Sequence, residues 1–197
     1  MKRKILFAIT LAVFLTATTN AQIEKKDWLL GGTIGLNTAS ANSTSNVNLA
    51  PHIGYALGNN SVIGMNLSFN YSTANYVAEK QHNLGLNSTV FFRKYFTIKE
   101  NFGWYSGFYA GGGFSFDKQI EADSTHTTTK NQNWNLRGGF IPGIYYKATQ
   151  YLLVTVDFGG IGYMYSNGYG RDGSSVTLNF LSSFTFGVDF ILGKHKS

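Results

Sequence analysis

The chain has 197 residues, enough for one domain, and combines 43% hydrophobic residues with only 13% charged residues and no cysteine. Soluble α/β domains carry about 25% charged residues, so this composition, with 23 glycines and 2 prolines, argues against that class and favours a two-faced β-sheet. Half of the formal charge of +6 comes from Lys2, Arg3 and Lys4. The other basic residues are scattered, so no nucleic-acid partner is predicted.

The N-terminal residues have the organisation of a secretory signal peptide. Residues 1–4 are cationic, residues 5–15 are almost wholly apolar, and small and polar residues then lead to Ala21. This order is typical of export signals, and the apolar run is shorter than the roughly 20 residues of a transmembrane helix. We therefore expect cleavage after Ala21 and one domain over residues 22–197; an uncleaved amphipathic or buried helix is the alternative.

Alternation of apolar and polar residues with a period of two predicts eight β-strands in the rest of the chain. The predicted strands cover residues 27–37, 46–57, 63–71, 81–96, 102–116, 133–147, 152–165 and 175–193. The last has the cleanest pattern, since its even positions from Val176 to Leu192 are apolar or aromatic except Ser182. Pro142 lacks a backbone donor and predicts a local irregularity, and a change of apolar phase predicts a β-bulge at Gly159 and Gly160.

Long and short connections alternate between the predicted strands. The short ones are residues 58–60, 97–101 and 148–150, and the long ones are residues 38–45, 72–80, 117–132 and 166–174. Short periplasmic turns and longer outer loops are the organisation of up-and-down barrels in the outer membrane. The sequence therefore predicts an all-β fold, an eight-stranded antiparallel up-and-down transmembrane β-barrel with both chain ends on the periplasmic side.

The two faces of the predicted sheet differ in side-chain volume. One face is mostly Phe, Trp, Leu, Ile and Val, and the other is mostly Gly, Asn, Ser and Thr. Because the interior of an eight-stranded barrel is narrow, we expect the small polar face to point inward and the apolar face to contact lipid. A soluble barrel with an apolar ligand cavity is the alternative. The predicted aromatic girdle consists of Trp28, Tyr71, Trp104, Trp134, Tyr163 and Tyr165.

Six ionisable residues fall on the inward face. They are His52, Arg93, Arg137, Lys147, Asp157 and Asp189. Two interpretations remain open: a lining that sets the ion preference of a narrow pore, or a salt-bridged plug that fills the barrel. Unpaired charges are costly in so narrow a lumen, which favours the plug. Arg137 and Asp157 are the first pair to test, because they lie on neighbouring predicted strands.

A lipid hydrolase at the outer rim is a further alternative. His82 lies near that level of the barrel, and Ser72 and Ser88 are close to it in sequence. A single histidine with abundant serines is weak support for catalysis, since no motif surrounds it. The sequence therefore predicts no catalytic residues, no cofactor and no metal site.

Several segments resemble the small outer-membrane β-barrels of Gram-negative bacteria, in particular the outer membrane protein beta-barrel domain type of Bacteroidetes. The similarity rests on the strand pattern, on the ending at residues 184–190, and on segments 91–96 and 108–113. A departure is the basic tail after Gly193, since many such proteins end on the last aromatic residue. The resemblance implies outer-membrane localisation, lipid and the barrel assembly machinery as partners, and a non-enzymatic structural or surface-interaction role through the outer loops. A porin-like channel is the alternative.

Overall fold

The computed structural model describes residues 23–39, 44–75, 79–121, 128–168, 171–180 and 184–193. The predicted signal peptide and the centres of the predicted long loops lie outside the described residues. The strands are β1 (Trp28–Ala39), β2 (Thr44–Gly58), β3 (Ser61–Asn75), β4 (Glu79–Lys99), β5 (Phe102–Glu121), β6 (Thr128–Thr149), β7 (Leu152–Asp157), β8 (Ile161–Gly168), β9 (Arg171–Leu178) and β10 (Thr185–Leu192).

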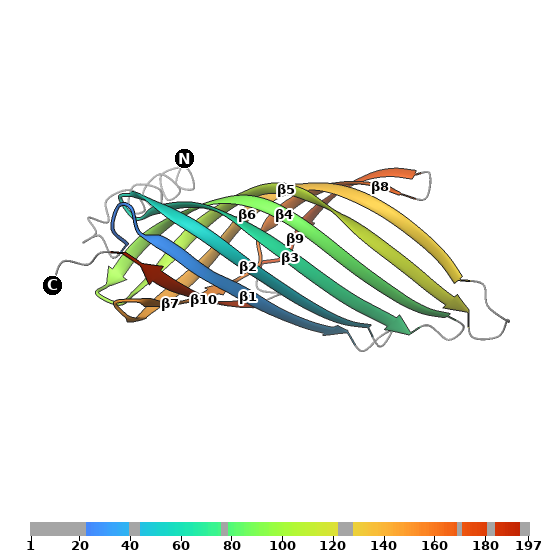
Figure 1. Ribbon diagram of the computed structural model, residues 1–197, viewed down its shortest axis with the longest axis horizontal. Coiled ribbons are helices and arrows are strands. Elements are labelled where there is room, and N and C mark those ends of the chain that lie inside the picture. The colour runs from blue at the N-terminus through green and yellow to red at the C-terminus, as the bar shows by residue number, and fades with distance from the viewer. Residues whose placement is uncertain are drawn as a thin grey trace, which may run out of the picture.

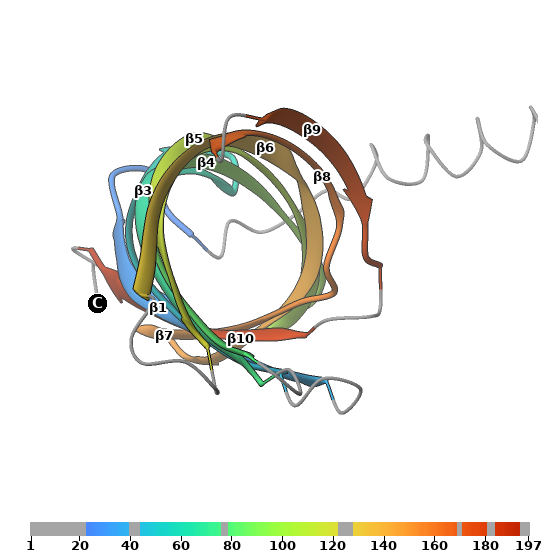
Figure 2. The same cartoon turned by 90° about the vertical axis from the view of Figure 1, so that its right-hand side faces the viewer.

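Eight of these strands close a barrel. Strands β1 to β6 pair in chain order, β6 also pairs with β7, β7 pairs with β10, and β10 pairs with β1. All of these pairs are antiparallel, and Figure 2 looks into the resulting cylinder. The predicted fold class, an eight-stranded antiparallel β-barrel, is confirmed.

Tight turns join the strands at one end of the barrel, which we call the turn end; the opposite end is the loop end (Figure 1). Between β2 and β3, Asn59 and Asn60 have φ values of 50° and 55°, which suit a two-residue hairpin turn. The turns at residues 100–101 and 150–151 are equally short, as predicted.

The hairpin of β5 and β6 is longer than the sequence pattern indicated. These strands run to Glu121 and from Thr128, so most of the predicted loop 117–132 is paired strand, which corrects that boundary. Polar contacts in the lumen accompany this extension. Asp117 accepts hydrogen bonds from the side-chain amides of Asn83 on β4 and of Asn133 on β6.

The predicted bulge at Gly159 and Gly160 is present and separates β7 from β8. Gly159 has a φ of 72°, and the register against β6 shifts by one residue between Gly143↔Asp157 and Phe140↔Ile161. Pro142 lies at this level. It does not interrupt β6, which stays in register with β5, but here the other partner of β6 changes from β8 to β7.

The predicted last strand, residues 175–193, is two strands rather than one. Residues Asn179 to Phe184 separate β9 from β10, and β9 pairs only with β8 among the described strands. The apolar alternation nevertheless keeps its phase, because Val176 on β9 and Phe186 on β10 are both exposed. Alternation therefore identified the faces here but not the break in pairing.

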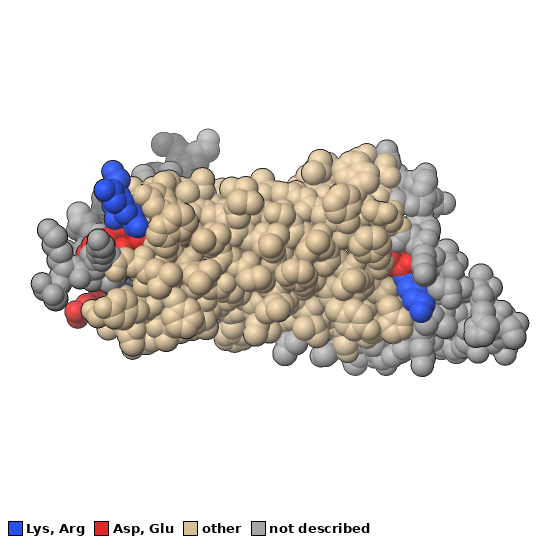
Figure 3. Space-filling model, viewed as in Figure 1, with Lys and Arg blue, Asp and Glu red and all other residues tan. Residues whose placement is uncertain are grey.

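The exterior of the barrel is apolar along its length. Exposed apolar side chains come from every described strand except β7, with exposures of 57% for Ile34, 54% for Met65 and 55% for Phe108 as examples. On the face drawn in Figure 3, charged side chains lie only at the two ends. The polarity of the two faces is therefore the reverse of that of a soluble protein.

The lumen is less polar than predicted in its turn-end half. A buried cluster there consists of Ile23, Leu29, Ala56, Val62, Phe91, Tyr95, Tyr105, Tyr145, Leu153 and Ile191. Glycines on facing strands make room for the rings. A Cβ built at Gly143 would collide with the Tyr105 ring and lie 2.6 Å from the carbonyl oxygen of Val156. Small and large inward residues are therefore matched across the lumen.

We expect Gly143→Ala to lower the free energy of unfolding by about 1–3 kcal/mol, because the added methyl group overpacks the lumen. Gly173→Ala on β9 is the matched control, since nothing lies within 4 Å of a Cβ built there. Urea titration of tryptophan fluorescence, with each variant refolded in lipid vesicles, measures the difference. Equal midpoints for the two variants would contradict the fit between Gly143 and Tyr105.

Candidate functional site

A charged cluster crosses the lumen in the turn-end half of the barrel. Nε2 of His52 on β2 and Oδ1 of Asp189 on β10 are hydrogen bonded, and both side chains are almost fully buried. Arg93 on β4 approaches the other carboxylate oxygen of Asp189, with 3.8 Å between Nη1 and Oδ2. Strands far apart in sequence are thus linked through one carboxylate.

Aromatic rings surround the guanidinium of Arg93. Its Cζ lies 4.9 Å from the ring centroid of Phe91 and 5.3 Å from that of Tyr105, within the range of cation–π contacts. Tyr105 donates a hydrogen bond to Asp157 on β7, which brings a second carboxylate to the cluster. The four charged residues are therefore held by rings as well as by one another.

Three tyrosines fill the lumen beside this cluster. The ring of Tyr95 lies 5.5 Å from that of Tyr105 and 5.3 Å from that of Tyr145, between centroids. Each ring is at most 2% exposed, and Tyr145 also hydrogen bonds to Thr97 at 2.9 Å. We call the charged cluster and these tyrosines the plug: His52, Tyr95, Arg93, Tyr105, Tyr145, Asp157 and Asp189.

Sequence reasoning missed the three tyrosines. They share the odd-numbered, inward face with Arg93 on β4, Gly107 on β5 and Lys147 on β6, so the period of two was a sufficient signal. Polarity alone does not distinguish them, because the amphipathic ring of tyrosine also suits the membrane interface.

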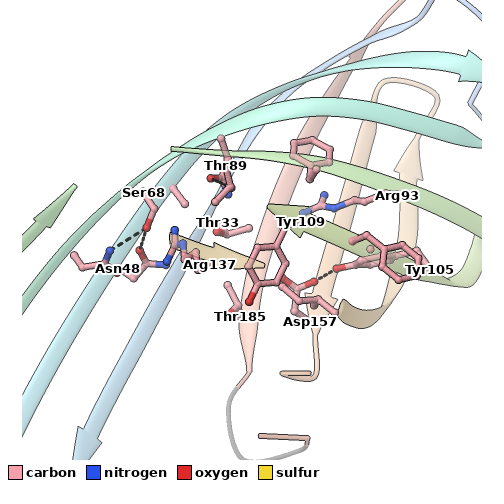
Figure 4. Close-up of a pocket in the computed structure, with 17 residues that line it drawn as sticks. Thr33, Asn48, Ser68, Thr89, Arg93, Tyr105, Tyr109, Arg137, Asp157 and Thr185 are labelled. Carbon is pink, nitrogen blue, oxygen red and sulfur yellow. Dashed lines mark hydrogen bonds between the residues drawn. The ribbon is translucent and has the colours of Figure 1, made fainter. Parts of the chain in front are cut away.

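A polar cavity lies on the loop side of the plug. Its volume is about 220 Å³, and Figure 4 shows its lining. On one wall the hydroxyl of Ser68 donates to Asn48 at 2.8 Å and accepts from Asn70 at 3.1 Å. Thr89 donates to Asn66 at 2.6 Å. These bonds satisfy the small polar side chains predicted for the lumen.

The structure places the other two inward cations away from the plug. No ion pair joins Arg137 to Asp157 within the described part of the chain, so the suggested pair does not form. Arg137 instead lies opposite Gly111 and Met164, and it lines the polar cavity. Lys147 lies at the turn end of β6, where its backbone nitrogen donates to Asn101 at 2.7 Å.

Four of the six predicted girdle residues, Trp28, Trp104, Trp134 and Tyr165, make ring contacts with neighbouring aromatic side chains. Trp28 packs on Tyr55 at 5.0 Å at the turn end, where Phe96 also stacks on Trp104 at 4.0 Å. At the loop end Trp134 packs on Tyr165 at 5.5 Å. Tyr71 and Tyr163 are about half exposed.

The residues of the hydrolase hypothesis are not brought together. His82 lies on the outer face of β4, where its Nδ1 is 3.1 Å from the hydroxyl of Tyr71. Ser72 is opposite Asn83, on the inward face. Ser88 is six positions along β4 from His82, or roughly 20 Å in a strand. Neither serine can therefore share a proton with His82, and the geometry gives no nucleophile–base pair there.

Neither a metal centre nor a helical span is seen in the described residues. No group of three His, Cys, Asp or Glu side chains there is placed to hold a metal ion. Across the same ranges, no helix is long and apolar enough to cross a membrane.

Comparisons with known proteins give structural likenesses only. The chain matches no family model and no curated protein. It is similar to OprG of Pseudomonas aeruginosa, with 10% identity, a TM-score of 0.45, and coverage of 88% of this chain and 99% of that one. It is also similar to Ail of Yersinia pestis, with 12% identity, a TM-score of 0.44, and coverage of 86% and 100%. It is similar as well to the N-terminal barrel of OprF from Pseudomonas aeruginosa, with 14% identity, a TM-score of 0.39, and coverage of 85% of this chain and 98% of that one.

The fold and the distribution of polarity define a class of protein. An antiparallel barrel with an apolar exterior and a hydrogen-bonded polar interior is a small transmembrane β-barrel.

Proposed function

We propose that this protein is an integral outer-membrane barrel that is closed to ions and acts at the cell surface through its loop end, without catalysis. The observation that carries the proposal is the combination of an apolar exterior with a filled lumen. An apolar exterior of this extent is insoluble in water and is stable when lipid covers it. A soluble ligand-binding barrel has the opposite arrangement, so the geometry disfavours that alternative.

The filled lumen disfavours the channel alternative. At the level of the plug, inward rings and charged groups from β2, β4, β5, β6, β7 and β10 meet across the barrel. An ion would have to displace buried, paired charges to pass, which is costly. We infer that this cluster fixes the register of the barrel rather than selecting ions.

Long strands at the loop end support a surface role. Strands β4, β5 and β6 have 21, 20 and 22 residues, whereas about 9–11 residues suffice to cross a bilayer. The ends of these strands project at the loop end in Figure 1. Beyond the exposed Phe116, the polar residues Asp117 and Lys118 continue β5. We infer that this projecting wall stands outside the bilayer and contacts the surroundings or lipid headgroups.

Gel mobility of membrane-extracted protein tests the membrane placement. We expect the unboiled protein to resist SDS and to migrate differently from the boiled chain. The reason is that every strand in the turn-end half of a closed barrel is hydrogen bonded to a neighbour on both edges. The outer-membrane fraction should contain it. Recovery from the soluble periplasmic fraction, with no heat-dependent shift, would overturn the proposal.

A further inference from the structure

The barrel wall has an opening beside the bulge that separates β7 from β8. A cavity of about 390 Å³ lies there. Its lining includes Ile161 and Tyr163, which are 45% and 52% exposed on the exterior face. It also includes Tyr109 and Arg137, which face the lumen. A single cavity therefore reaches residues of both faces at the point where β9 has no strand partner beyond β8 among the described strands, and we call this opening in the wall the window.

Fixed contacts frame the window. The backbone nitrogen of Asn179 donates to the carbonyl oxygen of Gly160 at 3.0 Å, and the nitrogen of Gly160 donates to the side-chain oxygen of Asn179 at 2.9 Å. Next to the bulge glycines, the ring of Phe158 packs on that of Phe184, which precedes β10, with 6.1 Å between the ring centroids. Two hydrogen bonds and a ring contact therefore fix the break between β7 and β8. The glycines of the bulge add no side chains to the window.

Strand β9 borders the window with both of its faces exposed. Val176 and Leu178, on the exterior face, are 74% and 69% exposed, and Ser175 and Thr177, on the opposite face, are exposed too. β9 has no strand partner beyond β8 in the described ranges. This part of the wall therefore presents apolar and polar groups side by side.

Arg137 supplies an uncompensated positive charge behind the window. Its Nε is buried without a hydrogen-bond partner, and its guanidinium forms no ion pair among the described residues. The positions opposite Arg137 are Gly111 and Met164, neither of which carries an acid. Arg137 is half-buried, and an anion bound there would accept charge-assisted hydrogen bonds from its guanidinium.

Apolar side chains line the polar cavity and the window together with Arg137. Ile141 and Tyr109 line the polar cavity and the window, and Met164 lines the window. The cavity of 390 Å³ is within the range of about 300–1,000 Å³ typical of small-molecule sites. The charged side chains common to both cavities are Arg137, which forms no ion pair among the described residues, and Asp157, and apolar side chains lead from Arg137 to the exterior.

We propose that the window and the polar cavity form one binding site for a single-chain anionic amphiphile. Arg137 binds the acid headgroup in the lumen, and the alkyl chain lies along Ile141 and Met164 toward the lipid-facing exterior. The ligand enters from the membrane, so this inference rests on the membrane placement proposed above. Because the plug fills the lumen beyond the cavity, the site retains its ligand rather than passing it to the turn end.

Equilibrium dialysis of the full barrel in lipid nanodiscs tests the site, with empty nanodiscs subtracted. The probes are dodecanoate, dodecyl phosphate and dodecyltrimethylammonium, which share one chain and differ in headgroup. We expect both acids to bind and the cation not to bind. Arg137→Gln should weaken acid binding by about tenfold or more, because a charge-assisted bond is lost, and Arg137→Lys should restore part of it.

A pair of glycine variants tests the window. A Cβ built at Gly162 would lie 3.0 Å from the hydroxyl of Tyr109, so Gly162→Leu narrows the opening. Gly173→Leu is the matched control on β9, where space is open. Only the first should weaken binding. Every protein must first show the heat-dependent gel shift, whose loss in the native chain would count against the membrane placement itself.

Three outcomes in folded protein would overturn the site while leaving the membrane placement intact. They are no acid binding by the native chain, equal binding of acid and cation, and affinity unaffected by Arg137→Gln or Gly162→Leu.

Discussion

Replacing Asp189 by alanine should lower the free energy of unfolding by about 3–5 kcal/mol, the largest effect expected of any single charge in the barrel. Asp189 is fully buried. Its carboxylate pairs with His52 through one oxygen and lies 3.8 Å from Arg93 through the other. Without it the Arg93 guanidinium stays buried with only Asp157 nearby as a carboxylate. Removing one member of a buried cluster costs more than the cluster itself contributes.

Urea titration in lipid vesicles, followed by tryptophan fluorescence, measures this loss. Asp189→Asn keeps the shape and removes the charge, so it should fold and show an intermediate loss if alanine fails to fold. A double-mutant cycle with His52→Ala isolates the coupling between the two side chains. Asp117→Ala is the matched control, since among the described residues that carboxylate accepts hydrogen bonds from two side-chain amides near the loop end and forms no ion pair. A loss for Asp189→Ala no larger than for Asp117→Ala would contradict the role of Asp189 in holding the plug.

Why the last strand breaks is explained by register, which sequence alone does not reveal. Asp157 pairs with Thr185, and Ile161 pairs with Leu178. Four steps of chain separate Asp157 from Ile161, but seven separate Leu178 from Thr185. The last strand thus has three residues more than its neighbour across the same interval, and an unbroken ladder cannot accommodate them. Alternation from Val176 to Leu192 conceals this, because it reports faces and not partners.

The same reason explains what was and was not predictable in the lumen. The period of two assigned His52, Arg93, Asp157 and Asp189 to the inward face, where the structure places them. Partner choice did not follow from strand adjacency. Asp157 is opposite Gly143, six residues along β6 from Arg137, which is roughly 20 Å in a strand. Cross-strand pairing needs the register as well as the order of the strands.

The bulge also accounts for the positions of the plug and the window, neither of which was predicted from the sequence. One extra residue at Gly159 and Gly160 changes the partner of β6 from β7 to β8. Asp157, which accepts a hydrogen bond from Tyr105 in the plug, lies opposite Gly143 on one side of the change, and Arg137 lies opposite Met164 on the other, while both side chains line the window. Sequence identified the bulge from a change of phase, but the separation of the charges depends on which strand each residue of β6 contacts.

Removing the three tyrosine rings should convert a silent barrel into a conducting one. We expect the native protein to give no single-channel steps in planar bilayers, and Tyr95→Ser, Tyr105→Ser and Tyr145→Ser together to give steps. The rings occupy the lumen between the charged cluster and the turn end, with centroids 5.3 and 5.5 Å apart, and serine leaves that space to water.

The matched control is a triple replacement on the exterior, Tyr146→Ser, Tyr151→Ser and Tyr163→Ser, whose rings are 53%, 49% and 52% exposed. It removes the same atoms without opening the lumen, so it should stay silent. Both triple variants must retain the heat-dependent gel shift, which separates an opened barrel from an unfolded one. Steps from the native chain would show that the plug does not close the lumen. If the folded inward triple variant gives no single-channel steps, the barrier to ions is not formed by the tyrosine rings. The charged cluster alone would then exclude ions.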